Sequence, residues 1–379
     1  MTLAGSAGES FAGVLRKIYW SGRRDRRRIP HLVGVLAGFL RSASALAWQR
    51  WALGRRLTIS VGLVEHLGDI VAAEPVARAI RRDHPGASLR WFVRAPYAAV
   101  PARFPAIDRV VTVGCLTEWM LLRASGLAGE AIDLHINGRY CPKCSVPIGK
   151  GGVAAQIGPE TYYRFGNLLR VQCLSAGLAP IEDGPVLDPG PDAERRADGL
   201  GLPERFVVIH CASNEEARDW MVAKWRALVD HITLRLGLDV VEVGTVARVI
   251  VTNAGRERTL CGDLSILETA AVIRRSALLI GIDSGPAHIA NAVGARGVIL
   301  LGHYRGFERY MPYSGAYANG RLAELVRAEG PAATLTVETV VAAVERGLLA
   351  AAPLAVSTCA SDNRSAGTSG IQGGWHEWI

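Results

Sequence analysis

The sequence predicts an α/β protein built on parallel β-sheets. The clearest indication is residues 262–304, where a helix, a strand, a tight turn, a second helix and a second strand follow in order. The predicted strands are short and almost entirely apolar, as expected of strands that are buried on both faces. The chain has 379 residues, 49% of them hydrophobic, which is enough for two domains with sizeable cores.

The first 56 residues carry nearly all of the net charge of +8. They hold eleven Lys/Arg and two Asp/Glu, a net of +9, whereas the rest of the chain holds 32 and 33, a net of −1. Positive charge confined to one arm argues against a groove for nucleic acid. Apolar residues at helical spacing and two tryptophans accompany the basic residues: Phe11, Val14, Leu15, Ile18, Tyr19, Trp48 and Trp51. We therefore expect an amphipathic helical extension, residues 1–56, that lies on an anionic membrane surface.

Two other interpretations of this extension are open. Its apolar run, residues 32–40, has about half of the ~20 residues that a membrane span needs. A signal peptide would explain a basic run before an apolar one, but the basic run begins late and Arg41 interrupts the apolar segment. The extension could also be solvated and partly disordered.

The first domain is expected to open with a strand at residues 57–63, a loop and a helix over residues 70–82. Pro75 would start this helix or kink it. Asp69 lies at the helix N-terminus, where a carboxylate stays ionised at pH 7 and could accept a proton from an attacking hydroxyl. The alternative is that Asp69 only caps the helix. Further strands are predicted at the following ranges: 88–94, 110–113 and 131–135.

The seven scattered cysteines indicate a reducing compartment rather than a disulfide framework. Cys141 and Cys144 form a lone C-x-x-C, and no second pair follows at zinc spacing. A D-x-D motif, which commonly holds a metal on a diphosphate, is also missing from the sequence. We therefore expect no bound metal and interpret Cys141–Cys144 as a turn, with metal binding or redox chemistry as the alternative.

The second domain should begin after residues 183–202, which are rich in Gly, Pro and Asp. This composition predicts the linker between the two domains. Strands are predicted at residues 206–210 and 239–243, with an amphipathic helix between them. Two helical stretches within residues 321–349 are expected to pack back on the first domain. Residues 350–379 are small and polar and should form a disordered tail.

The best candidate for a ligand site is the turn Asp283–Pro286. It follows a predicted strand at residues 277–282 and caps a helix that ends near Val293. Ligands bind outside the carboxyl ends of parallel strands, and the amides and dipole at a helix N-terminus suit a diphosphate. Asp283 would repel a phosphate, so we expect it to accept hydrogen bonds from sugar hydroxyls or backbone amides. The alternative is a purely structural Asp-Ser turn.

The same turn resembles the C-terminal signature of glycosyltransferase family 9, the lipopolysaccharide heptosyltransferases and their relatives. Residues 283–290 match the family pattern D-[ST]-G-P-x-H-x-A, and Asp69 and Pro75 match the spacing of its opening strand, loop and helix. The resemblance covers roughly residues 57–315. It implies two facing Rossmann-like domains of the GT-B type, residues 57–185 for the acceptor and residues 186–349 for the donor.

The resemblance also implies roles for single residues. Asp69 would be the catalytic base, and Lys224, with Arg218 as its substitute, would contact the donor phosphate. The implied donor-binding set is Lys224, Ser213, Asp283, Ser284, Gly285, Pro286 and His288. The implied reaction is the inverting, metal-independent transfer of a sugar from a nucleotide-sugar to a cell-surface glycan or lipopolysaccharide-type acceptor. The resemblance favours heptose as the sugar and ADP-heptose as the donor. Such an enzyme would be cytoplasmic and peripheral on the inner face of the cytoplasmic membrane, with no nucleic-acid partner.

Two departures from the family pattern fall on the acceptor side. His135 stands where the family usually has Gln, and the Cys141–Cys144 turn replaces the usual helix. A lone histidine at such a place is more often a satisfied polar group than a catalyst. A non-catalytic, membrane-peripheral nucleotide-sugar-binding or assembly protein is therefore the alternative function. Asp69 discriminates between the two, because a binding protein needs no base.

Overall fold

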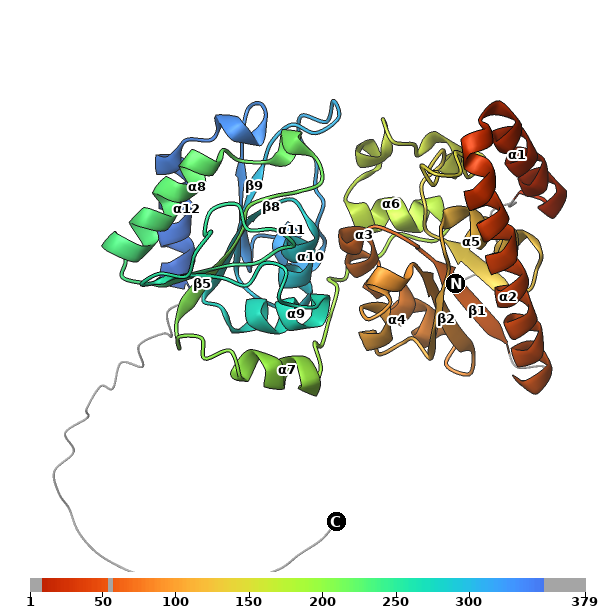
Figure 1. Cartoon of the computed structure of the whole chain (residues 1–379), viewed down its shortest axis with the longest axis horizontal. Helices are drawn as coiled ribbons and strands as arrows, with labels where there is room; N and C mark the ends of the chain where they lie inside the picture. Colours follow the sequence, from red (N-terminus) through yellow and green to blue (C-terminus); the bar gives the residue numbers. More distant parts are fainter. Residues whose placement is uncertain (1–8, 54–56, 351–379) are drawn as a thin grey trace, which may run out of the picture.

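The computed structural model describes residues 9–53 and 57–350, so the predicted C-terminal tail lies almost wholly outside the described residues. Two α/β domains lie side by side, as predicted, with the N-terminal domain on the right of Figure 1 and the C-terminal domain on the left. Each domain contains one parallel sheet. The GT-B-type architecture expected from the sequence is therefore confirmed.

The N-terminal domain has a four-stranded sheet in the order β3-β2-β1-β4. Its strands are β1 (Thr58–Gly62), β2 (Ser88–Val93), β3 (Arg109–Thr112) and β4 (Glu130–Asp133). Its helices are α3 (Leu67–Ala72), α4 (Glu74–Asp83), α5 (Leu116–Ala124) and α6 (Leu168–Ser175), with short turns η2 (Ala95–Tyr97), η3 (Pro101–Arg103), η4 (Gly152–Gln156) and η5 (Tyr162–Phe165). The sequence predicts all four strands to within two residues.

The C-terminal domain has a six-stranded sheet in the order β10-β9-β8-β5-β6-β7. Its strands are β5 (Phe206–His210), β6 (Asp239–Glu242), β7 (Glu257–Thr259), β8 (Leu278–Ile282), β9 (Gly297–Leu301) and β10 (Ala323–Arg327). Its helices are α7 (Pro191–Asp198), α8 (Val222–Asp230), α9 (Ile266–Arg275), α10 (Gly285–Ala292), α11 (Gly315–Ala318) and α12 (Val337–Ala350), with η6 (Glu216–Arg218), η7 (His231–Arg235) and η8 (Ala332–Thr334).

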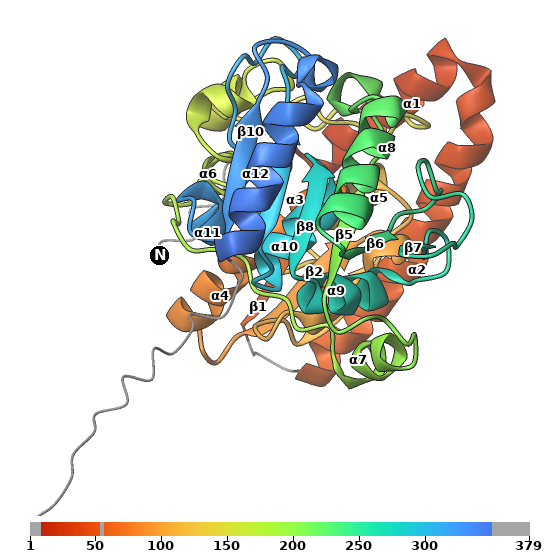
Figure 2. The same cartoon turned by 90° about the vertical axis from the view of Figure 1, so that its left-hand side faces the viewer.

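Side chains of the central strands alternate between two cores, as the period of a β-strand requires. Val207 and Ile280 pack toward the core that contains residues of α8 and α12, and these two helices lie on one face of the sheet in Figure 2. Val208 and Leu279 pack toward α9 and α10 on the opposite face. Apolar residues on both faces of each strand explain the unbroken apolar runs in the sequence.

Both sheets change direction next to their first strand, between β1 and β4 and between β5 and β8. Ligands of open parallel sheets bind at this switch point, outside the carboxyl ends of the strands. Residues that follow β1, β4, β5 and β8 line a common cleft between the domains. The fold thus places both candidate motifs of the sequence at a single cleft.

Three expectations about helices are corrected by the structure. The helix expected over residues 70–82 is two helices, α3 and α4, because Pro75 falls in the first turn of α4. The second half of the predicted linker is α7, which packs on α9 of the C-terminal domain. Residues 321–349 contain strand β10 before α12, and α12 packs on its own sheet rather than on the first domain.

The basic extension is a pair of helices, α1 (Phe11–Arg24) and α2 (Ile29–Leu53), joined by η1 (Arg26–Arg28). It lies on the side of the N-terminal domain that faces away from the C-terminal domain (Figure 1). Val14 and Ile18 are buried in a core shared with Trp119 of α5. Val14 and Ile18 of the apolar stripe are thus not available to a membrane, whereas Leu15 and Tyr19 of the same helix are exposed.

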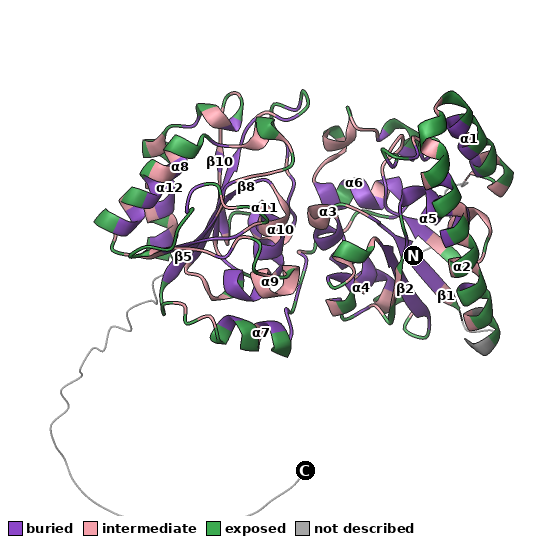
Figure 3. Cartoon of the chain, in the orientation of Figure 1, coloured by how far each residue is buried: buried purple, intermediate pink, exposed green. Residues whose placement is uncertain are grey.

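The outer surface of the helix pair nevertheless remains apolar in places. Most of α2 is exposed (Figure 3), and its exposed large side chains are Ile29, Val33, Leu40, Trp48 and Trp51. By length and composition alone, residues 26–49 could cross a membrane, and only 22% of the apolar 18-residue stretch within them is buried. The helical apolar segment is thus longer than the run of residues 32–40 that the sequence suggests.

Gly62 of β1 shows how tightly the N-terminal core is built. A Cβ atom at Gly62 would overlap Cε2 of the fully buried Trp119, whereas a Cβ at Gly86 would meet nothing within 4 Å. We expect Gly62→Ala to lower the free energy of unfolding by about 1–3 kcal/mol, the usual range for overpacking a core. Gly86→Ala should change it by less than ~0.5 kcal/mol. Denaturant unfolding of both variants checks this, and equal stabilities would contradict it.

Candidate active site

A cleft of about 1000 Å³ lies between the two domains. It is lined from the N-terminal domain by residues that follow β1 and β4 and by η5, and from the C-terminal domain by residues that follow β5, β6, β8 and β9. Cavities of this size are typical of sites that bind small molecules and cofactors. Of the predicted site residues, the cleft contains Asp69, Ser213, Asp283, Ser284, Gly285, Pro286 and His288.

Asp69 lies in the first turn of α3 and lines the cleft from the N-terminal domain. Its Oδ2 accepts a weak hydrogen bond from the backbone N–H of His66 at 3.4 Å, so it does cap the helix. Its carbonyl oxygen accepts a hydrogen bond of 2.9 Å from Gln172 of α6. These contacts fix the position of the carboxylate at the cleft surface, and the capping role therefore does not exclude the role of a base.

Two glycines allow α3 and α10 to pack closely across the domain boundary. A Cβ at Gly68 would lie 2.6 Å from Cδ2 of His288, and a Cβ at Gly285 would lie 2.7 Å from Cδ2 of Leu67. Any side chain larger than hydrogen would push the two helices apart. The glycine beside Asp69 is thus what brings this carboxylate near the N-terminus of α10.

Asp283 is 3% exposed and is held by side chains of its own domain. Its carboxylate accepts hydrogen bonds from the hydroxyls of Tyr310 at 3.0 Å and Tyr313 at 3.5 Å, and it forms an ion pair with Arg218 at 3.4 Å. The carboxylate of Asp283 is thus engaged by side chains of its own domain, and its expected hydrogen bonds to sugar hydroxyls or backbone amides stay a prediction. Asp283 holds a cation at the floor of the cleft.

Arg218 of η6 is the cation at this position. It donates to the carbonyl oxygen of Asp283 at 3.1 Å, and its guanidinium lies 3.9 Å from the ring centroid of Tyr304. Burial alone would lower the pKa of Arg218, but Asp283 and the neighbouring tyrosines raise it above its ordinary value. Its buried Nε has no hydrogen-bond partner among the described residues. A fixed, charged donor of this kind is suited to an anionic ligand.

Lys224 is not in the cleft. Its ammonium donates to the carbonyl oxygens of Ala333 and Leu335, both at 2.7 Å, and so fastens α8 to the segment before α12. Arg218, the substitute named with it, does line the cleft, and its contact with a donor phosphate stays a prediction. Ser213 does line the cleft, but its hydroxyl donates within its own loop to Glu215 and Asp219.

Ser284, Gly285 and Pro286 form the turn from β8 into α10, as predicted. Ser284 occupies the cap position without a side-chain capping hydrogen bond. Pro286 has no N–H, and those of Ala287 and His288 donate to the carbonyl oxygen of Ser284, so Gly285 is the residue of this turn whose N–H group is left for a ligand. His288 is almost fully buried beside Tyr313, and burial lowers its pKa below the ordinary value. The imidazole is therefore neutral at pH 7 and adds no charge to the site.

Sequence reasoning missed an aromatic wall of the cleft. Tyr162 and Tyr163 of η5 come from the N-terminal domain and contact Phe307 of the C-terminal domain, with ring centroids 5.3 and 5.5 Å apart. Tyr304 and Arg305 line the cleft, and Glu215 binds both of them. The adjacent pair Tyr162-Tyr163, in a segment otherwise poor in apolar runs, was the available signal.

His135 is a satisfied buried group, as expected. Its Nε2 accepts a hydrogen bond from the backbone N–H of Val64 at 3.1 Å, which leaves Nδ1 to donate to Asp133 at 2.6 Å. Burial would raise the pKa of Asp133, but Lys150, His135 and Arg123 hold it well below its usual range. This network holds the loop after β4 in place. The loop forms one wall of the cleft and contains the residues that differ from the family pattern.

The expectation of no metal rested on the absence of partners for Cys141 and Cys144. In the structure, Cys115 and His31 come from distant parts of the chain and lie beside the thiols of Cys141 and Cys144. The further metal-binding side chains that the local sequence pattern lacks are therefore supplied by the fold. Within the part of the chain that the structure describes, the cleft itself contains no such group of metal-binding side chains.

Comparisons with known proteins agree with this architecture. Residues 188–324 match the model of glycosyltransferase family 9 (heptosyltransferase). Lipopolysaccharide heptosyltransferase 3 of Escherichia coli is 29% identical over 116 residues, which is 28% of this chain and 34% of that protein. The match thus spans about a third of the length of the curated relative, and it supports the resemblance inferred from the C-terminal signature.

Solved structures of glycosyltransferases share the two-domain fold of this chain. A family 9 glycosyltransferase from Veillonella parvula superimposes with a TM-score of 0.58 at 19% identity, over 77% of this chain and 97% of that one. The E. coli heptosyltransferase WaaC with ADP gives 0.53 at 14% identity, over 77% and 100%. The E. coli ADP-heptose lipopolysaccharide heptosyltransferase II gives 0.53 at 15%, over 77% and 98%.

If Arg218 is the cation that meets an anionic ligand, Arg218→Gln should weaken binding of ADP by about 10- to 100-fold, the value of a charged hydrogen bond of about 1.5–3 kcal/mol. Lys224→Met is the matched control and should leave the dissociation constant within about twofold, because Lys224 lies outside the cleft. Titration calorimetry of both variants measures this. Loss of affinity in Lys224→Met alone would restore Lys224 as the phosphate ligand.

Proposed function

Starting from a C-terminal domain of the glycosyltransferase family 9 type, we propose that this protein is an inverting glycosyltransferase. It transfers heptose from ADP-heptose to a hydroxyl of a lipopolysaccharide-type or other cell-surface glycan acceptor. The choice of donor is supported by relatives named as heptosyltransferases, one of them solved with ADP. The nucleotide-sugar and the glycan or glycolipid acceptor are its two substrates.

One observation carries the proposal: a carboxylate from one domain and a cation from the other face the same cleft. Asp69 is placed there by α3, and Arg218 is placed there by Asp283. A base on one side and compensation for negative charge on the other are the two requirements of sugar transfer from a nucleoside diphosphate. A protein that only binds a nucleotide-sugar would need the second but not the first.

In the proposed reaction, Asp69 accepts the proton of the acceptor hydroxyl as its oxygen attacks the anomeric carbon. The new bond from oxygen to carbon forms as the bond from the anomeric carbon to the phosphate oxygen breaks, and the electron pair leaves with the nucleoside diphosphate. Attack opposite the leaving group inverts the configuration. The carboxylate of Asp69 must be ionised to accept this proton.

The leaving diphosphate is proposed to lie between Arg218 and the first turn of α10, Ser284–Pro286. The N–H group of Gly285 and the helix dipole act there together with the guanidinium, whereas Pro286 has no N–H group. Charge compensation by these fixed groups needs no reorganisation during the reaction. The neutral His288 contributes by packing against Gly68, which keeps the two halves of the site together.

The alternative, a membrane-peripheral nucleotide-sugar-binding protein without activity, is favoured by one feature. Both ring nitrogens of His135 are engaged by Val64 and Asp133, so this replacement for the family's usual Gln offers no hydrogen bond to an acceptor. An acceptor would then have to be recognised by other residues of the loop after β4, such as Arg139 and Tyr140, which line the cleft.

Asp69→Asn tests the proposal directly. The amide keeps the size of the side chain but cannot take a proton, so kcat should fall by about 10²- to 10⁴-fold. Donor affinity should stay within about twofold, because the diphosphate is held by the other domain. Turnover of ADP-heptose with a lipopolysaccharide core acceptor, with calorimetry of ADP binding alongside, separates the two effects. Turnover close to that of the original protein would favour the binding-protein alternative.

We further propose that the helix pair α1–α2 holds the protein on an anionic membrane surface. Arg23, Arg24, Arg26 and Arg27 are exposed at the turn between the helices, and Trp48 and Trp51 are 66% and 73% exposed near the end of α2. Each basic residue near an anionic bilayer contributes about 1 kcal/mol, and tryptophan favours the interface.

The double variant Trp48→Ser, Trp51→Ser should reduce co-sedimentation with anionic liposomes at low salt, and the original protein should be released near 1 M salt, where the Debye length is about 3 Å. Leu349→Ser, at a side chain that is 77% exposed on α12, is the control and should bind liposomes normally. Deletion of residues 1–56 is not a clean test, since it also removes Val14 and Ile18 from the core. Liposome binding that both variants retain equally would refute the membrane role of α2.

A further inference from the structure

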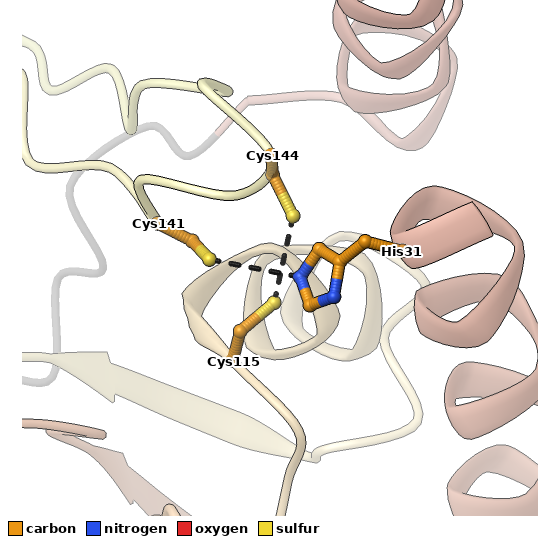
Figure 4. A group of neighbouring side chains, drawn as sticks. All are labelled: His31, Cys115, Cys141 and Cys144. Carbon is orange, nitrogen blue, oxygen red and sulfur yellow. Dashed lines mark hydrogen bonds between the residues drawn. The ribbon is translucent and has the colours of Figure 1, made fainter. Parts of the chain in front are cut away.

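Four side chains with metal-binding atoms lie close together beside the loop after β4, which lines the cleft with Arg139, Tyr140 and Pro142. Cys115 precedes α5, Cys141 and Cys144 lie in the loop after β4, and His31 reaches them from α2 (Figure 4). Their ligand atoms all lie within 4.8 Å of one another. Residues 31, 115 and 141 are far apart in the sequence, so the grouping is a product of the fold.

The distances between the four ligand atoms are close to those that a tetrahedral metal site requires. A metal with four ligands at about 2.3 Å separates them from one another by about 3.8 Å. The sulfur atoms of Cys115 and Cys144 are 3.7 Å apart, and the sulfur of Cys141 is 3.7 Å from Nε2 of His31. The remaining pairs need to close by no more than ~1 Å, which side-chain rotation alone can supply.

Burial disfavours free thiolates at these cysteines, so a bound metal would have to supply the compensating charge. Cys115 is the N-cap residue of α5, where the helix dipole stabilises negative charge. The backbone N–H groups of Cys144 and Ser145 both donate to the carbonyl oxygen of Cys141, and this tight turn brings the two thiols of the C-x-x-C onto the same side. All three cysteines are at most 6% exposed, so a thiolate cannot be stabilised there by water.

The same loop is fastened to the helix pair by hydrogen bonds around the four ligands. Ser21 of α1 donates to the carbonyl oxygen of Cys144, and Lys17 donates to that of Pro147 at 2.9 Å. The loop that brings two of the four ligands is therefore held against α1 by hydrogen bonds that need no ion. A preorganised set of ligands on a rigid frame is what a structural metal site requires.

We propose that His31, Cys115, Cys141 and Cys144 bind one Zn²⁺ that joins the helix pair α1–α2 to the N-terminal domain. Three sulfurs and one imidazole in tetrahedral arrangement are a ligand set typical of structural zinc. All four positions are filled by protein, so the ion has no open site for catalysis. Zinc replaces the weak contacts among the thiols as the link between α2, α5 and the loop.

The zinc also has a consequence for the cleft, which rests on the proposed transfer reaction. Pro142 lies between the two ligands of the loop and, with Arg139 and Tyr140, lines the cleft on the acceptor side. The ion would thus fix the wall that differs most from the family pattern. Loss of zinc should raise KM for the acceptor while donor affinity, which depends on the other domain, stays unchanged.

Elemental analysis of the full-length protein, purified without chelators or a metal-affinity tag, should find about one zinc per chain. Cys141→Ser should lower this to below ~0.2, and Cys173→Ser, which changes a buried cysteine outside the group, should retain it. Zinc content of the original protein near zero, both as purified and after incubation with Zn²⁺, would overturn the proposal. One iron per chain in place of zinc would overturn the choice of metal.

Two measurements on the unmutated protein keep the test independent of folding and of activity. Titration with an organomercurial should release the zinc to a colorimetric chelator as about three thiols react. Replacement by Co²⁺ should give the intense thiolate charge-transfer and tetrahedral d–d absorption bands of a Cys₃His site. Zinc released without modification of these thiols, or Co²⁺ bands typical of oxygen ligands, would place the metal elsewhere. If zinc is present but no transferase activity is found, the metal site stands and the proposed function fails.

Discussion

The arrangement of the cleft depends on the close packing of α3 against α10. Hydrogen atoms at Gly68 and Gly285 are all that the available space permits, because His288 and Leu67 of the opposite domains occupy the rest. This contact places the N-terminus of a helix from each domain at the same cleft, one carrying a carboxylate and the other offering the N–H group of Gly285. Arg218, which is held by its ion pair with Asp283 beside Tyr310 and Tyr313, provides guanidinium donors at the same place. A wider contact would move the Asp69 carboxylate away from Arg218 and from the N-terminus of α10.

Much of this architecture could be predicted from the sequence because its signals are local. Buried parallel strands appear as short apolar runs, and eight of the ten strands were found in this way. The capping box of Ser265 and Glu268 marks the start of α9, and both of its hydrogen bonds are present. The two strands that were missed, β7 and β10, lie at the edges of the sheet and carry charged residues at half-exposed positions. Nothing in such segments distinguishes a strand from a helix or loop.

The errors concern contacts between distant residues, which local patterns do not encode. Lys224 has the residue type and spacing expected of a phosphate ligand, but its helix directs it to the carbonyl oxygens of Ala333 and Leu335. The lone C-x-x-C gave no reason to expect a metal, since the other two ligands, His31 and Cys115, come from other segments. The sequence predicts a separate basic extension, whereas five of its apolar residues are buried in the core around Trp119: Val14, Ile18, Leu32, Val35 and Leu46. The helix pair α1–α2 and the loop after β4 are therefore in contact, and the group of His31, Cys115, Cys141 and Cys144 lies between them.

The central claim is that the donor lies between the two helix N-termini, with its diphosphate on Arg218 and its sugar toward Asp69. A crystal structure of the protein with ADP and with an unreactive fluorinated analogue of ADP-heptose tests this claim most directly. We expect phosphate oxygens within hydrogen-bond distance of Arg218 and of the N–H group of Gly285. We also expect the face of the anomeric carbon opposite the phosphate to point toward the carboxylate of Asp69. A diphosphate bound elsewhere, or a sugar directed away from Asp69, would contradict the claim.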